Sequence, residues 1–193
     1  MEMETDPKKL DITNNIIGIL KHYECPKECG AYCCKRERVY ISKKDYTDIS
    51  KLHRTNIKHI SITDDFEKGD YFLNYPCGLL VNDKCSVHKN KPWTCSIYPF
   101  KFADNVPHMH VALQACPMSL KIALDWTVFS TWVNINSNMS ENDKKNSFDI
   151  MTINIKTFEK DIKNFKTSKR IKEIYIPVNM LHTFRCILDD ANR

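Results

Sequence analysis

The hydrophobic and polar positions in the first third of the chain predict two helices with a short strand between them. Asp6 can cap a helix N-terminus and Pro7 suits the first helical position, so we expect a helix over residues 7–23. An apolar run predicts a strand at 39–41. Ser42 is a suitable N-cap for the helix that follows, whose apolar residues recur at helical spacing.

The middle of the chain consists of short apolar runs interrupted by turn-forming residues, a pattern that predicts hairpins. The stretch "CGLLVNDKCSV", residues 77–87, predicts a hairpin that turns at Asn82-Asp83. The stretch "FKFADNVPHMHVAL", residues 100–113, predicts a second hairpin. The polar stretch "SITDDFEKGD", residues 61–70, is expected to be a loop.

The last third of the chain predicts mainly helices. Ser119 can cap a helix that continues to about residue 133, and a final helix is expected after Pro177. The predicted fold class is therefore α+β, a small cysteine-rich domain with short hairpins, flanking helices and a helical C-terminal extension. We assign residues 1–118 to the cysteine-cluster domain with its N-terminal helix, and residues 119–193 to the extension packed on it.

Basic residues are concentrated late in the chain and account for its net charge of +5. Between Lys144 and Glu173 there are nine Lys or Arg residues and four acidic ones. Apolar residues recur at helical spacing over 155–165 with lysines between them, which indicates an amphipathic helix with solvated lysines. Because few arginines and no interleaved aromatic residues accompany these lysines, nucleic acid is not an expected partner, whereas a protein partner stays open.

The cellular compartment decides how the cysteines are interpreted. No stretch approaches the roughly 18 apolar residues of a membrane span, so no membrane partner is expected. The polar start "MEMETDPKKLDITNN" lacks the pattern of a secretory signal, which predicts a cytoplasmic location. In a reducing compartment, clustered thiols favour metal binding or chemistry, and the odd total of nine cysteines agrees; a disulfide framework is the alternative.

Eight of the nine cysteines fall into two groups of four along the chain. The run "CPKECGAYCC" contains the first group, and the second is spread over residues 77–116. The eight candidate metal ligands are Cys25, Cys29, Cys33, Cys34, Cys77, Cys85, Cys95 and Cys116. Four thiolates satisfy one zinc ion or one four-iron cluster, so these eight suffice for two complete sites or for one larger site.

The adjacent pair Cys33-Cys34 raises the question of one metal centre or two. Neighbouring side chains diverge by about 100° on a helix and by nearly 180° on a strand. Regular structure would therefore direct the two thiols to different centres, or to separate atoms of a polynuclear cluster. Irregular backbone, which Pro26 and Gly30 would help to form, is the alternative.

The sequence contains features that separate zinc from iron. It has no paired C-x2-C knuckles, which are typical of zinc ribbons. The dipeptides Cys25-Pro26 and Cys116-Pro117 are typical of the proline beside ligands in iron–sulfur sequences. An iron–sulfur cluster or iron is therefore the predicted cofactor, and zinc is the alternative.

The run from Cys25 to Cys34, followed by "YPCGLLVNDKCSVHKNKPWTCSIYPF" and Cys116-Pro117, resembles the YkgJ-like cysteine-cluster family, described as a zinc- or iron-chelating domain. The similarity covers about residues 22–118 and is most specific over 85–100. The resemblance implies that the eight cysteines named above are the metal ligands. The chain departs from the family in its first cluster, which has three residues between successive cysteines up to Cys33 where the family is commonly tighter.

Some larger proteins that resemble this family are flagellin lysine methylases, which adds protein modification to the functions that the resemblance implies. His88 lies between two of the cysteines and is expected to donate a hydrogen bond to a thiolate or a carbonyl group, with metal ligation as the alternative. Cys186, in the predicted terminal helix, is expected to be a buried structural thiol, with a role as a ninth metal ligand as the alternative.

No familiar catalytic motif is present. The four glycines cannot build a P-loop or a dinucleotide-binding turn, and H-E-x-x-H and G-x-S-x-G do not occur, so whether the chain is an enzyme stays open. The predicted function is a cytosolic metal-binding protein that binds iron through eight cysteines, as iron–sulfur, in a redox, metal-handling or protein-modification role. The alternative is a structural zinc-binding interaction module without catalytic activity.

Overall fold

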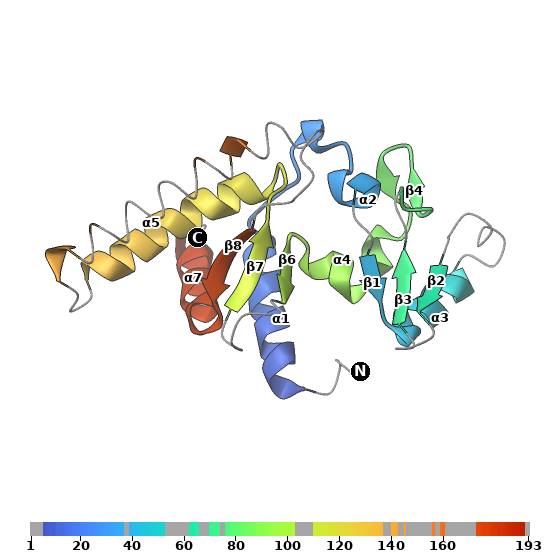
Figure 1. Ribbon diagram of the computed structural model, residues 1–193, viewed down its shortest axis with the longest axis horizontal. Helices are drawn as coiled ribbons and strands as arrows, with labels where there is room; N and C mark the ends of the chain where they lie inside the picture. The colour runs from blue at the N-terminus through green and yellow to red at the C-terminus, as the bar shows by residue number, and fades with distance from the viewer. Residues whose placement is uncertain are drawn as a thin grey trace. The chain divides into compact units, whose positions relative to one another are not determined.

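The computed structural model describes residues 6–36, 39–52, 62–65, 70–73, 76–102, 110–136, 140–142, 145, 156, 159–160 and 173–191. The chain forms two compact units, one made of Met1–Pro26 with Pro99–Arg193 and the other of Lys27–Tyr98. Both units combine helices with small antiparallel sheets, which confirms the predicted α+β class (Figure 1). The assignment of residues 1–118 to a cysteine-cluster domain and of residues 119–193 to an extension packed on it stays a prediction.

In the part of the first unit that the structure describes, three helices of 14 to 17 residues accompany a three-stranded sheet in the order β6-β7-β8. Its elements are α1 (Pro7–Leu20), β6 (Phe100–Phe102), β7 (His110–Gln114), α5 (Ser119–Ile135), β8 (Glu173–Pro177) and α7 (Val178–Ala191). The central strand β7 pairs antiparallel with both neighbours, and Val111 lies opposite Ile176 in β8. The hairpin predicted over residues 100–113 is confirmed by the pairing of β6 with β7.

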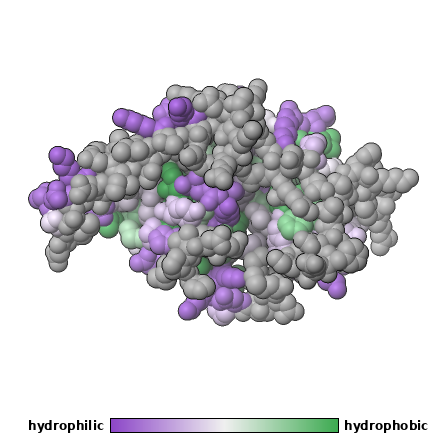
Figure 2. All heavy atoms as spheres, in the orientation of Figure 1, coloured by the Kyte–Doolittle hydropathy of each residue, from purple (hydrophilic) through white to green (hydrophobic). Residues whose placement is uncertain are grey.

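Aromatic side chains from α5 and α7 form the centre of this unit's core. The ring centroids of Trp126, Phe129 and Phe184 lie 5.3–5.4 Å from one another, within the range of favourable aromatic contacts. All three side chains are buried, as are Ile16 and Ile19 of α1. On the face shown in Figure 2, the coloured hydrophobic residues form small areas between hydrophilic ones. Among the described residues, no helix has the length and apolar character needed to cross a bilayer.

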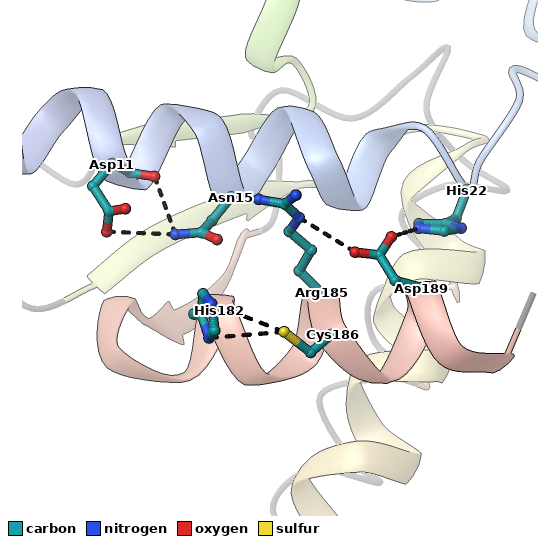
Figure 3. A network of polar contacts seen from close by, with 7 residues as sticks. All are labelled: Asp11, Asn15, His22, His182, Arg185, Cys186 and Asp189. Carbon is teal, nitrogen blue, oxygen red and sulfur yellow. Dashed lines mark hydrogen bonds and ion pairs between the residues drawn. The ribbon is translucent and has the colours of Figure 1, made fainter.

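Helix α1 begins as predicted, because the Asp6 side chain accepts a hydrogen bond from the Lys8 N–H at 3.0 Å and Pro7 occupies the first turn. The helix lies beside α7, to which polar side chains connect it (Figure 3). The imidazole Nε2 of His22 is 2.7 Å from Oδ1 of Asp189, and the Arg185 Nε is 3.5 Å from the other oxygen of this carboxylate. Gly18 permits this arrangement, because a side chain there would collide with Arg185.

The second unit contains six of the nine cysteines, and its described residues form a three-stranded sheet, a two-stranded hairpin and several helices. Its elements are η2 (Lys27–Cys29), α2 (Tyr32–Arg36), β1 (Val39–Ile41), α3 (Lys43–Leu52), β2 (Ile62–Asp65), β3 (Asp70–Leu73), β4 (Leu80–Val81), β5 (Lys84–Cys85), η4 (His88–Asn90) and α4 (Trp93–Ile97). A small core of Ile41, Ile49, Leu73, Leu79 and Val87 holds these elements together.

The start of α3 has the capping arrangement that the sequence predicts. The Ser42 hydroxyl oxygen accepts the Asp45 N–H at 3.0 Å, and the Asp45 carboxylate accepts the Ser42 N–H at 3.1 Å. The second oxygen of Asp45 accepts the N–H of Trp93 at 3.4 Å, and the Thr94 hydroxyl donates to the carbonyl of Tyr40 at 2.6 Å. These bonds hold the short helix α4 against β1 and α3.

Three expectations about local structure need correction. The stretch 61–70 was expected to be a loop, but Ile62–Asp65 forms β2, which pairs antiparallel with β3. Ser119 was expected to cap α5, but it is the first helical residue, because its hydroxyl bonds to Cys116 instead. The C-terminal part is not entirely helical, since Glu173–Pro177 forms β8. The predicted basic helix over 155–165 lies outside the described residues, apart from Lys156 and residues 159–160.

Candidate metal centre

Two residues in left-handed backbone conformation shape the first cysteine run. Gly30 has a φ of 53° and Ala31 a φ of 59°, between η2 and α2. Glycine adopts this conformation at no steric cost, whereas an alanine costs about 1–2 kcal/mol. The turn ends with a bond from the Cys34 N–H to the Ala31 carbonyl at 3.0 Å. The backbone is thus irregular before the adjacent cysteines and becomes helical at them.

The adjacent cysteines of α2 bring their sulfur atoms close together. The Sγ atoms of Cys33 and Cys34 are 3.9 Å apart. Two thiolates on one tetrahedral ion, each about 2.3 Å from the metal, are about 3.8 Å apart. The observed distance therefore permits the pair to share one ion, although helical geometry was expected to direct the two thiols apart. The helix is only five residues long, and the turn before it sets its first residues.

Cys34 connects the first cysteine run to the second. The Cys77 N–H donates to the Cys34 carbonyl at 2.7 Å. The Cys34 thiol also forms hydrogen bonds with the thiols of Cys33 and Cys77. These bonds raise the pKa of Cys34 and lower that of Cys33, while the bond from Cys34 lowers the pKa of Cys77 to about 7. Cys34 thus forms hydrogen bonds with two thiols whose pKa values these bonds lower.

The predicted hairpin at 77–87 positions two further cysteines. Asn82 and Asp83 have φ values of 49° and 58°, as a tight turn between β4 and β5 requires, which confirms the prediction. Cys77 and Cys85 pack against the apolar core of the unit. The Asp83 carboxylate at the turn lies 2.6 Å from the Lys35 ammonium group, next to Cys34 in α2. The hairpin is thereby linked to the helix that contains the adjacent cysteines.

Cys95 is positioned by α4. Its burial, followed by the charges of the Cys33, Cys77 and Cys85 thiols, raises its pKa to about 12. Burial also raises the pKa of Cys85, which the charges of Cys77 and Cys33 raise further. The Lys91 ammonium lowers the pKa of both Cys85 and Cys95. Lys91 thus compensates thiolate charge here.

The structure therefore brings together thiols that lie far apart in the sequence. Cys33, Cys77, Cys85 and Cys95 interact electrostatically, Cys34 bonds to two of them, and Cys29 acts on Cys33. Within the part of the chain that is described, no three Cys, His, Asp or Glu side chains converge closely enough to hold one metal ion. The donor set still fits a soft metal, because it consists of sulfur atoms and two of them lie at the separation of tetrahedral ligands.

Cys25 and Cys116 belong to the first unit. Cys116 is buried, and its Sγ accepts the N–H of Ser119 at 3.4 Å, in the first turn of the 17-residue helix α5. Cys25 is exposed, and its Sγ lies 3.8 Å from Sδ of Met118.

Other candidate residues lie elsewhere. His88 is exposed in η4. Cys186 was expected to be buried, but it is exposed, because it lies on the solvent side of α7, with its Sγ 3.8 Å from Nδ1 of His182 (Figure 3). Sequence reasoning did not single out Met118 or the Cys116–Ser119 contact. The position of a further sulfur two residues after Cys116 was the available signal.

Comparison with known families agrees with this geometry. Residues 24–117 match the sequence model of the CxxCxxCC family, described as "Putative zinc- or iron-chelating domain". The matched region begins just before Cys25 and ends just after Cys116, so it includes all eight candidate ligands. No curated protein and no solved structure matches the chain significantly.

Proposed function

The chain carries a domain of the zinc- or iron-chelating CxxCxxCC family, and on that premise we propose that it binds iron through eight cysteines, as iron–sulfur, in one centre or in two. The proposed ligands are Cys25, Cys29, Cys33, Cys34, Cys77, Cys85, Cys95 and Cys116. The proposed role is redox chemistry, metal handling or protein modification in the cytoplasm. Such a centre would supply one-electron transfer or a Lewis-acidic iron.

One observation carries the proposal: Cys33, Cys77, Cys85 and Cys95, from three separate stretches of sequence, lie near enough to one another that the charge of one raises the pKa of another. Six cysteines lie in the second unit, whereas one tetrahedral ion requires four ligands. The cysteines beyond the four that one ion needs support a polynuclear centre. Packing of Cys77 and Cys85 against apolar side chains would limit the access of water to it.

The rival function is a structural zinc module that holds the fold and binds a protein partner. The 3.9 Å distance between the Cys33 and Cys34 sulfurs favours this alternative, because it matches two ligands of one tetrahedral zinc ion. The two functions differ in metal and in sulfide content.

Anaerobic purification of the full chain tests the choice. Metal analysis, acid-labile sulfide analysis and an absorption spectrum are measured on the same sample. We expect iron and sulfide in comparable amounts with broad visible absorbance. Stoichiometric zinc without sulfide or visible absorbance would replace the iron–sulfur proposal with the zinc module.

Single serine substitutions test the ligand set. Cys33→Ser and Cys34→Ser are each expected to lower the amount of bound metal, and the comparison shows whether the pair serves one centre or two. The matched control is Cys186→Ser, an exposed cysteine in α7 that should leave the metal content unchanged. Full metal retention in both α2 variants would exclude the pair from the ligand set.

A further inference from the structure

Met118 places a ninth sulfur atom beside the candidate ligands. Its Sδ lies 3.8 Å from Sγ of Cys25, and its side chain is half-buried, whereas Cys25 is exposed. Met118 also follows Cys116 by two residues. The Met118 thioether therefore lies near the proposed ligand Cys25 in space and near the proposed ligand Cys116 in the sequence.

The local backbone holds Met118 in this position. Met118 occupies the N-cap of α5, where its side chain forms no capping hydrogen bond. Such positions favour Ser, Thr, Asp or Asn, whose oxygen can accept an N–H, and methionine has no such atom. Ser119 instead closes the turn, since its hydroxyl accepts the Cys116 N–H at 2.7 Å and donates to the Cys116 carbonyl at 2.9 Å. Helix capping therefore does not explain a methionine here.

The chemistry of a thioether suits a metal ligand at this place. Methionine sulfur is soft, polarizable and neutral, and it binds the same soft metals as thiolate. The distance to the Cys25 sulfur equals the roughly 3.8 Å that separates two sulfur ligands of a tetrahedral ion. A neutral sulfur also adds no negative charge to a centre that already has many thiolates.

We propose that Met118 is a metal ligand, acting with Cys25 on a soft metal ion held by the first unit. The inference rests on the proposed metal-binding function and adds a ligand that the cysteine pattern does not contain. In a redox centre, replacing a thiolate by a thioether raises the reduction potential, as methionine ligation does in haem proteins.

Selenium spectroscopy tests the assignment on the full chain. The protein is labelled with selenomethionine and purified anaerobically, and selenium X-ray absorption is measured with the metal that copurifies. We expect a selenium–metal distance of about 2.3–2.5 Å in the wild-type protein. This signal should disappear in Met118→Leu, and competition with a chelator should show metal affinity at least about tenfold lower in that variant.

The matched control is Met180→Leu, which removes a half-buried methionine of α7 and should retain both the signal and the affinity. Circular dichroism checks that both variants fold. A wild-type chain with bound metal but no selenium–metal distance would overturn the ligand assignment alone. A wild-type chain that binds no metal would overturn the proposed function and the ligand assignment together.

Discussion

The thiol groups of the second unit differ in how tightly they hold their protons. Hydrogen bonds from Cys34 lower the pKa of Cys33 and Cys77, whereas burial raises the pKa of Cys85 and Cys95. Metal binds the thiolate form, so each protonated cysteine must release a proton when it becomes a ligand. Buried members of the set therefore make metal affinity dependent on pH.

Cys95 provides a direct test, because its pKa of about 12 keeps it protonated across the neutral range. For each ligand that is protonated in the metal-free protein, metal affinity should rise about tenfold for every unit increase in pH. We expect Cys95→Ser to lower the slope of log affinity against pH by about one between pH 6.5 and 8.5, measured by chelator competition. Equal slopes in both proteins would show that Cys95 does not lose a proton to metal.

At this scale, sequence reasoning could identify the cysteines but not their contacts. The eight candidates follow from thiol chemistry and short spacing along the chain. The bonds of Cys34 to Cys77, and the approach of Met118 to Cys25, depend on tertiary packing over many residues. A pattern of residue types contains no information on such distances.

Helix α5 has two faces of different environment but similar hydrophobicity. Its inner face buries Trp126 and Phe129 against α7, whereas Leu124, Val128 and Trp132 on successive turns are exposed. A helix that is apolar on all sides does not reveal its buried face by periodicity. The structure is needed to say which residues support the fold.

Paired substitutions in α5 check this difference. Phe129→Ala removes a ring that is 5% exposed and should cost about 3–5 kcal/mol of unfolding free energy. Val128→Ala alters a side chain that is 71% exposed and should change stability by no more than about 0.5 kcal/mol. Urea denaturation measures both. Comparable losses in the two variants would contradict the assignment of the faces.

The contact between α1 and α7 should depend on pH through Asp189. The hydrogen bond with His22, with help from Arg185, lowers the pKa of this carboxyl group. A lowered pKa means that the contact stabilises the fold above the ordinary value of about 4 and ceases to do so as the pH falls below it. Asp189→Asn should therefore reduce stability at pH 7, and its deficit should shrink towards pH 3.

Urea denaturation at pH 7, 5 and 3 measures this deficit. Asp48→Asn, in an exposed position of α3, serves as the control variant. A deficit that is the same at all three pH values would show that the Asp189 carboxylate is not the source of the effect.

Helices with capping residues and hairpins with turn residues were predictable, as α1, α3 and the turn at Asn82-Asp83 show. Strands β2 and β8 were not predictable from the sequence. β2 is a four-residue edge strand with two acidic residues, and β8 pairs with a strand more than fifty residues earlier. Strands of this kind are stabilised by their partners rather than by their own sequence.

At the scale of the whole molecule, the second unit is inserted between two segments of the first along the sequence. The apolar cluster that its described residues form has five buried members, which is small for the core of an independent unit. If metal contributes to its folding, removal of metal should destabilise it.

Thermal unfolding with and without a strong chelator measures that contribution. A loss of 2 kcal/mol would lower the midpoint by roughly 8–16 °C in a domain of this size. Restoring the metal should restore the midpoint. An unchanged midpoint after complete metal removal would show that the fold does not depend on the metal.

The contacts of Cys34 also predict how the protein behaves in air. Dissolved oxygen can take two electrons and two protons from the Cys34 and Cys77 thiols, which are hydrogen-bonded to each other, and leave a disulfide. Closing the loop over residues 34–77 would stabilise the chain by about 4 kcal/mol through chain entropy. The same bond would consume two of the proposed ligands. Protein that has aged in air should therefore unfold at a higher temperature while it binds less metal. A high melting temperature is then no sign of an intact centre.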